Sequence, residues 1–163
     1  MSRIPITVEG FRRLERELGN LKKERPGVIQ AIKEAREEGD LSENAGYDAA
    51  RERQGMIEAR IRYIETRLAT SQVIDLATLD GDRVIFGATV EIEDAETGER
   101  KQYTLLGPDE ADPAKGSISI MSPVAQALLG KEEGDEIVVE APRGKIHYEI
   151  VSICFNGPAP AEA

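Results

Sequence analysis

Two apolar seams at coiled-coil spacing run through the first half of the chain. The first comprises Phe11, Leu14, Leu18, Leu21, Arg25, Val28, Ile32 and Ala35, and the second comprises Tyr47, Ala50, Gln54, Ile57, Ile61, Ile64 and Leu68. Paired in reverse order, the seams keep a constant register, with Arg25 opposite Gln54 and Ile32 opposite Tyr47. A constant reversed register is typical of an antiparallel helical hairpin, and it predicts a turn near Gly39.

The predicted turn is strongly acidic. Residues 37–47 read EEGDLSENAGY, with four carboxylates in eleven residues. Gly39 is suited to ending the first helix in a left-handed conformation, and Asp40 or Ser42 to capping the second. Helices of about 30 residues would form an arm about 45 Å long. The acids are therefore predicted to lie at the tip of a projecting arm.

Charge and composition exclude several classes of protein. The net charge is −10, but residues 1–72 carry 14 Lys and Arg against 13 Asp and Glu, whereas residues 73–163 carry 7 against 18. The second half is therefore unsuited to binding nucleic acid by bulk charge. His147 and Cys154 are the only histidine and cysteine. The chain therefore has too few of these residues for a disulfide framework or a zinc cluster, and a Cys–His or Ser–His catalytic site would have only one histidine to draw on. Without an apolar signal core or a long apolar run, the sequence predicts a soluble, cytoplasmic protein.

From residue 73 the helical pattern gives way to strand periodicity. Strands are predicted over 83–94, 99–106 and 117–121, a short helix over 124–129, and a hairpin of strands over 135–141 and 145–155. Residues 157–163 have the composition of a disordered tail. The sequence thus predicts an α+β protein, with an antiparallel coiled-coil hairpin over residues 1–75 and an antiparallel sheet domain with a short helix over residues 76–156.

Asp40 and Glu43 admit two interpretations. Asp40-Leu41-Ser42-Glu43 fits a variant of the capping box, in which both acids bond backbone N–H groups at a helix start. The same carboxylates suit Mg²⁺, which usually takes one or two protein carboxylates and completes its octahedron with other groups and water. Asn44 adds an oxygen beside them, for either helix-start hydrogen bonding or a role at the tip. Two carboxylates on a solvated tip hold such an ion weakly, so a metal site would have to be completed by a partner.

Motifs along most of the chain resemble those of the bacterial Gre family of transcript cleavage factors. They are GDLSENAGYDAARERQG (39–55), QVID (72–75), GDRVIFGATV (81–90), GPDEAD (107–112), SPVA (122–125) and LGKEEGD (129–135). The resemblance runs in order from about Ile4 to Phe155. Gly46 departs from the Glu that the family pattern leads us to expect, and glycine in an early helical turn costs roughly 1 kcal/mol relative to Ala.

The resemblance implies a function that depends on a partner. In the family, a coiled-coil arm enters the secondary channel of RNA polymerase, and tip acids help to hold the second catalytic Mg²⁺ while the polymerase cleaves its backtracked transcript. Asp40 and Glu43 match those acids. The second domain is expected to have an FKBP-like fold and to dock near the channel entrance. The resemblance thus implies a monomeric stimulator that contacts the 3′ end of backtracked RNA, binds no membrane, and is not a nuclease by itself.

Basic and aromatic residues near the tip also have alternative roles. Arg36 and Arg51 are the candidates for binding RNA phosphates, as in the family's basic patch, and the alternative is ion pairing with Glu37, Glu38 and Glu52 on solvated helix faces. Tyr47 is assigned to the seam and to supporting the tip, with base stacking as the alternative.

Residues of the second half are given structural roles. His147 is expected to be half-exposed on a strand, Cys154 to be buried in the sheet, and Asp109, Glu110 and Asp112 to form a solvated loop. Three functions remain to be compared: a cleavage stimulator, a channel binder that regulates or inhibits polymerase without cleavage, and a prolyl isomerase suggested only by the second domain.

Overall fold

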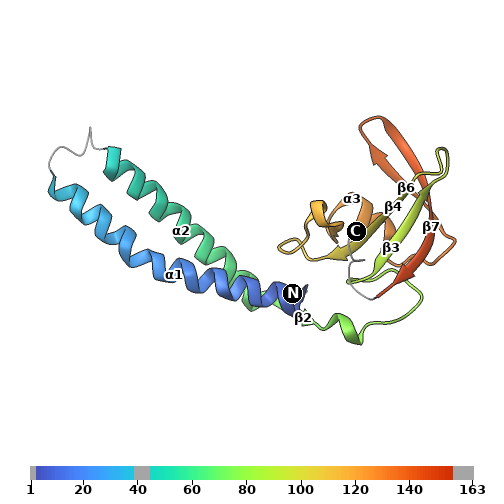
Figure 1. Cartoon of the computed structure of the whole chain (residues 1–163), viewed down its shortest axis with the longest axis horizontal. Coiled ribbons are helices and arrows are strands. Elements are labelled where there is room, and N and C mark those ends of the chain that lie inside the picture. Colours follow the sequence, from blue (N-terminus) through green and yellow to red (C-terminus); the bar gives the residue numbers. More distant parts are fainter. Residues whose placement is uncertain (1–2, 39–44, 156–163) are drawn as a thin grey trace, which may run out of the picture. The chain divides into compact units, whose positions relative to one another are not determined.

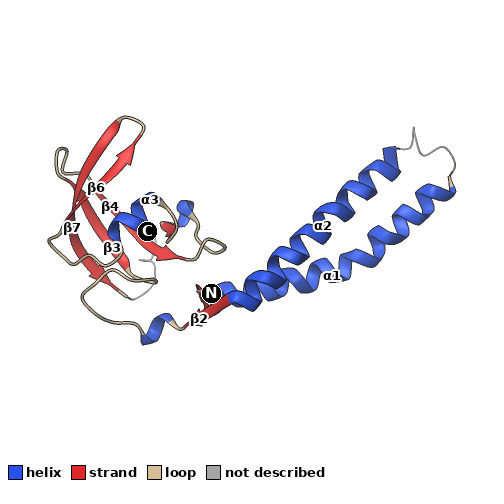
Figure 2. Ribbon diagram, turned by 180° about the vertical axis from the view of Figure 1, so that it is seen from behind, coloured by secondary structure: helices blue, strands red, loops and turns tan. Residues whose placement is uncertain are grey.

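A computed structural model describes residues 3–38 and 45–155 of the chain. The chain divides into two compact units: Phe11–Ser71, and the residues up to Gly10 together with those from Gln72 onward. The first unit is helical and the second is built around a β-sheet (Figures 1 and 2). Within the described ranges, no helix is both long enough and apolar enough to cross a membrane.

Two long helices form the predicted hairpin. Helix α1 spans Val8–Glu37 and α2 spans Ala45–Thr70, and Figure 1 shows them side by side in opposite directions. Every residue of the two predicted seams is buried or half-buried, whereas nearly all other positions on these helices are exposed. The antiparallel coiled-coil hairpin is therefore confirmed, because the spacing of the seam places its side chains on the facing sides of both helices.

The arm has a tightly buried core and a polar layer. Ile57, Ile61 and Ile64 are almost completely buried on α2. Further along, Arg25 pairs with Glu58, Nε to Oε1 at 2.8 Å and Nη2 to Oε2 at 3.0 Å, so its charged partner lies one helical turn from the predicted Gln54. Arg53 pairs with Glu24 and Arg60 with Glu17 between the two helices, each through two hydrogen bonds. These contacts strengthen the register that the apolar seam sets.

Truncation of the arm core should destabilise the hairpin. Ile61 is 1% exposed, so Ile61→Ala should lower the free energy of unfolding of the arm by roughly 2–5 kcal/mol, because it removes buried methyl groups and leaves a cavity. Met56→Ala on the same helix is the control, because Met56 is 57% exposed. Urea unfolding followed by circular dichroism at the helix band measures both, and equal destabilisation by the two variants would contradict this assignment of the core.

The second unit contains a curled five-stranded sheet. Its strands are β3 (Thr89–Asp94), β4 (Arg100–Leu106), β5 (Ser117–Ser119), β6 (Glu136–Ala141) and β7 (Gly144–Cys154), in the order β5-β4-β3-β7-β6. All neighbours pair antiparallel except β5, which runs parallel to β4. The short helix α3, Pro123–Leu128, is capped by the Ser122 hydroxyl. It contributes Ala125 and Leu128 to the core formed by the sheet.

Some local features of this unit differ from the prediction. The strand expected from residue 83 begins only at Thr89, because Gly87 adopts a φ of +88° in a turn that interrupts the extended backbone. Cys154 is exposed at the end of β7, not buried in the sheet, and His147 is also exposed. A two-stranded sheet of β1 (Ile4–Thr7) and β2 (Ser71–Ile74) was not predicted, because four-residue strands give little periodic signal.

Candidate functional site

The acidic segment that carries Asp40, Glu43 and Asn44 lies outside the described residues. Its flanks are described: α1 ends at Glu37 and α2 begins at Ala45. The segment therefore joins the distal ends of the two helices. Carboxylate oxygens are the donors that Mg²⁺ prefers, and two of them match the number that proteins usually supply to this ion. Elsewhere, within the described residues, no group of three or more His, Cys, Asp or Glu side chains is placed to hold a metal ion.

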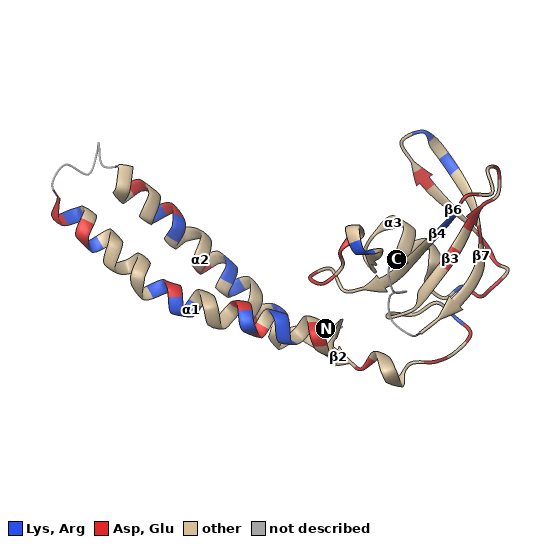
Figure 3. Cartoon of the chain, viewed as in Figure 1, with Lys and Arg blue, Asp and Glu red and all other residues tan. Residues whose placement is uncertain are grey.

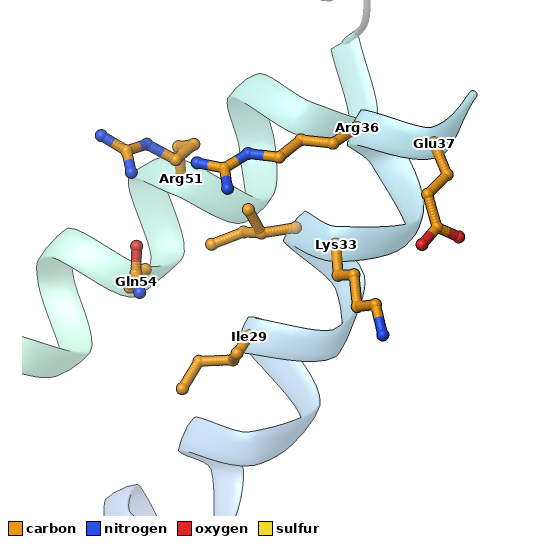
Figure 4. A pocket seen from close by; sticks show the side chains of 7 residues that line it. Ile29, Lys33, Arg36, Glu37, Arg51 and Gln54 are labelled. Atoms are coloured by element: carbon orange, nitrogen blue, oxygen red, sulfur yellow. The ribbon is translucent and has the colours of Figure 1, made fainter. Parts of the chain in front are cut away.

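A cavity of about 410 Å³ opens between α1 and α2 close to the distal end of the arm. It is lined by Ile29, Ile32, Lys33, Arg36, Glu37, Arg51 and Gln54. Figure 4 shows the Arg36 side chain reaching from α1 toward Arg51 on α2, so the structure brings together the two arginines that the sequence singled out. The lining combines two isoleucines with three basic residues and one acidic residue, Glu37, so its net positive charge suits a ligand with an anionic group.

Arg36 and Arg51 differ in their partners from Arg25, Arg53 and Arg60, which pair with glutamates across the arm. Among the residues that the structure describes, neither forms an ion pair, so the alternative pairing with Glu37, Glu38 or Glu52 is not observed. Arg53, by contrast, is held by Glu24 through two hydrogen bonds, and the bond from Arg53 keeps the pKa of the Glu24 carboxyl below its usual value. Figure 3 shows the mixture of basic and acidic residues along both helices. The distal pair remains available to bind phosphate, which arginine does well.

Tyr47 supports this basic pair. It is half-buried in the seam near the start of α2, as predicted, and the guanidinium carbon of Arg36 lies 5.9 Å from the centre of its ring. A cation at this distance from an aromatic face is attracted to the ring. Tyr47 therefore helps to orient Arg36 toward the cavity, and base stacking is not needed to explain its position.

In the second unit, the prediction for Glu110 is wrong. Glu110, expected in a solvated loop, is 8% exposed and accepts hydrogen bonds from the backbone and hydroxyl of Thr7 and from the backbone of Gly107. Asp112 accepts from the backbone N–H of Ala114 and so caps a short 3-10 helix, Pro113–Lys115. Sequence reasoning missed Glu110 because Thr7, which supplies two of its donors, lies more than a hundred residues away in the sequence. Gly107, three residues before Glu110, was the local signal, and it makes room for the carboxylate together with the distant Gly10.

Comparisons with known proteins agree with this architecture. A family model described as "Transcription elongation factor, N-terminal" matches residues 4–73, and one described as "Transcription elongation factor, GreA/GreB, C-term" matches residues 79–155. The chain is 80% identical over 157 residues to the transcription elongation factor GreA of Nitratidesulfovibrio vulgaris strain DP4, covering 96% of each chain. It is 76% identical to the GreA of Solidesulfovibrio magneticus, covering 99% of this chain and 98% of that protein.

Solved structures include a crystal structure of GreA factor homolog 1 from Thermus thermophilus. It is 29% identical, covers 93% of this chain and 99% of its own, and superposes with a TM-score of 0.44. The two family models together cover most of the chain, and the relative at 80% identity matches 96% of it. The resemblance noted from the sequence motifs is therefore confirmed: the chain belongs to the GreA/GreB family of transcription elongation factors.

Proposed function

We propose that this protein inserts its helical arm into the secondary channel of RNA polymerase and stimulates cleavage of backtracked nascent RNA, which rescues arrested complexes. The observation that carries the proposal is the position of Asp40 and Glu43 in the segment joining the distal ends of α1 and α2. At 1.5 Å per residue, the 30 residues of α1 give an arm about 45 Å long. Such an arm can deliver an acidic pair to a site buried inside a large enzyme.

The acidic pair and the basic pair have different roles in this proposal. Asp40 and Glu43 would hold the second Mg²⁺ jointly with polymerase; when bound, that ion activates water and stabilises charge in phosphodiester hydrolysis. The oxygen of the attacking water forms a bond to phosphorus while the bond to the 3′ oxygen breaks. Arg36 and Arg51 contact phosphates of the extruded 3′ segment and hold it beside the acids. The chemistry therefore belongs to polymerase, and the factor supplies missing ligands.

The second unit is the docking domain in this proposal, at the entrance of the channel, with the factor acting as a monomer. A prolyl isomerase is disfavoured because the aromatic side chains of this unit are used in its core: Tyr148 is 6% exposed, and Tyr103 and Phe155 pack against the same cluster. In this proposal polymerase supplies the remaining ligands of the metal site, so the factor is not expected to act as a nuclease by itself.

Transcript cleavage on a stalled complex tests the proposal. Added to a backtracked elongation complex with RNA labelled at its 5′ end, the protein should shorten the transcript from the 3′ side, and only when polymerase and Mg²⁺ are both present. Free labelled RNA with the protein alone is the control and should stay intact. Binding to polymerase without cleavage would favour the alternative of a regulator or inhibitor in the same channel, and cleavage of free RNA would contradict the division of roles.

A further inference from the structure

The carboxylate of Glu110 joins two distant parts of the chain. Its Oε1 accepts from the backbone nitrogens of Thr7 and Gly107, both at 3.1 Å, and its Oε2 accepts from the Thr7 hydroxyl. Burial of a carboxylate is costly unless it is hydrogen-bonded, and here every partner is a donor. A fully hydrogen-bonded carboxylate therefore holds the segment around Thr7 against the turn between Gly107 and Glu110.

The backbone around Glu110 is shaped to fit it. A Cβ atom on Gly10 would lie 2.2 Å from Oε2 of Glu110, and one on Gly107 would lie 2.8 Å from the carbonyl oxygen of Pro5. The backbone nitrogen of Gly10 in turn donates to the Thr7 hydroxyl at 3.0 Å, so Thr7 caps the first turn of α1. We call Thr7, Gly10, Gly107 and Glu110 the Glu110 joint. It is close-packed: a side chain at position 107 would clash with backbone, and one at position 10 would displace the Glu110 carboxylate.

The joint holds the first turn of the helix that leads to the tip. Residues up to Gly10 belong to the sheet-containing unit, and α1 continues without interruption from Val8 to Glu37. We propose that Glu110 is a positioning residue: by fastening the start of α1 into the docking domain, it restrains the arm so that the tip acids stay at the polymerase active centre. This inference rests on the proposed function, because it assumes that the docking domain and the tip act on the same polymerase.

Because the arm is long, a small rotation at the Glu110 joint moves the tip a large distance. For an arm about 45 Å long, a swing of about 10° at the base moves the tip by about 8 Å. A misplacement of about 1 Å between reacting groups can cost on the order of 100-fold in rate. A loosened joint would therefore reduce cleavage even when the tip residues and the docking surface are unchanged.

Glu110→Gln tests the joint, because it keeps the shape of the side chain but replaces one acceptor oxygen by an N–H donor that would face other donors. The matched control is Glu136→Gln, the same change of charge on an exposed residue of the same unit. Spin labels on the native Cys154, which is exposed, and on Ala31→Cys, at an exposed position of α1, report the spread of the distance between the units. Glu110→Gln should broaden this distribution about two-fold, and Glu136→Gln should leave it unchanged. An unchanged width with Glu110→Gln would overturn the role of the joint.

Cleavage kinetics supply the second readout. With factor titrated against a fixed backtracked complex, Glu110→Gln should lower the maximal cleavage rate about ten-fold while the half-saturating concentration changes by less than about three-fold. A full maximal rate combined with a broadened distance distribution would overturn positioning. If the unsubstituted protein does not stimulate cleavage at all, the proposed function fails, and the distance measurement still decides whether the joint restrains the arm.

A second pair of variants keeps the test decisive if Glu110→Gln does not fold. Thr7→Val removes the hydroxyl that bridges Glu110 and Gly10, whereas Thr7→Ser keeps it. Thr7→Val should broaden the distance distribution and slow cleavage at saturation, and Thr7→Ser should do neither. Equal behaviour of the two variants in both measurements would overturn the proposal.

Discussion

Combining Asp40→Asn with Glu43→Gln should reduce transcript cleavage by about a thousand-fold or more while the fold and polymerase binding persist. Asn caps a helix about as well as Asp, and Gln preserves a capping box, so helix formation should be little affected. The same changes remove negative charge where a hard cation needs it. Cleavage of labelled RNA, competition binding to polymerase and thermal melting measure the three properties on each variant.

The response to Mg²⁺ separates the metal interpretation from the capping interpretation. Raising the concentration of Mg²⁺ should partly restore cleavage by either single variant, because mass action offsets a weakened site. The unsubstituted factor, measured over the same range, is the control. Near-normal cleavage by the double variant would contradict the metal hypothesis and leave both acids as helix caps.

Replacing Arg36 and Arg51 together by Gln should reduce cleavage at limiting factor by about ten- to a hundred-fold. These arginines rim the distal cavity without an ion pair among the described residues, so their loss removes contacts to phosphate more than contacts within the arm. The salt dependence of the factor's action should also become weaker, by a slope of about 0.7 for each lost contact to single-stranded RNA. Cleavage rates at several salt concentrations test both effects.

The control for this prediction removes the same charge elsewhere on the arm. Arg12 and Arg62 are exposed residues of α1 and α2, and Arg12→Gln combined with Arg62→Gln also lowers the positive charge by two. If the effect depends on position, the control should keep most of the activity and its salt slope. Equal losses in the two double variants would instead indicate a general electrostatic attraction to polymerase.

The arm could be predicted closely from the sequence because its structure depends on local spacing. Arg25 shows the limit of this approach. Its place in the seam was predicted correctly, but its side chain pairs with Glu58 and not with the predicted Gln54. A long side chain can reach one helical turn further to a charged carboxylate, which binds it more strongly than an amide does. The strands were predicted for a similar reason, and the largest error in extent came from Gly87, whose positive φ has no periodic signature.

The Glu110 joint could not be predicted, because its chemistry is spread over distant segments. An acid in a turn between Gly107 and Asp112 has the composition of a solvated loop, and only folding brings the N–H and hydroxyl of Thr7 to it. The same limit applies to the cavity beside Arg36 and Arg51. Their common position followed from the reversed register, but the absence of ion pairs within the described residues depends on side-chain packing.

The uneven core of the arm implies a gradient of amide hydrogen exchange. Three almost fully buried isoleucines, Ile57, Ile61 and Ile64, lie from the middle of α2 toward its end away from the tip. Among the described residues closer to the tip, only Ile32 and Ala35 are buried, and the cavity lies there. The free energy of local opening follows buried apolar contacts, so protection should decline along each helix toward the tip. If the arm enters a channel as proposed, helices that open more readily near the tip can adapt to the channel wall while the part of the arm near the second unit stays folded.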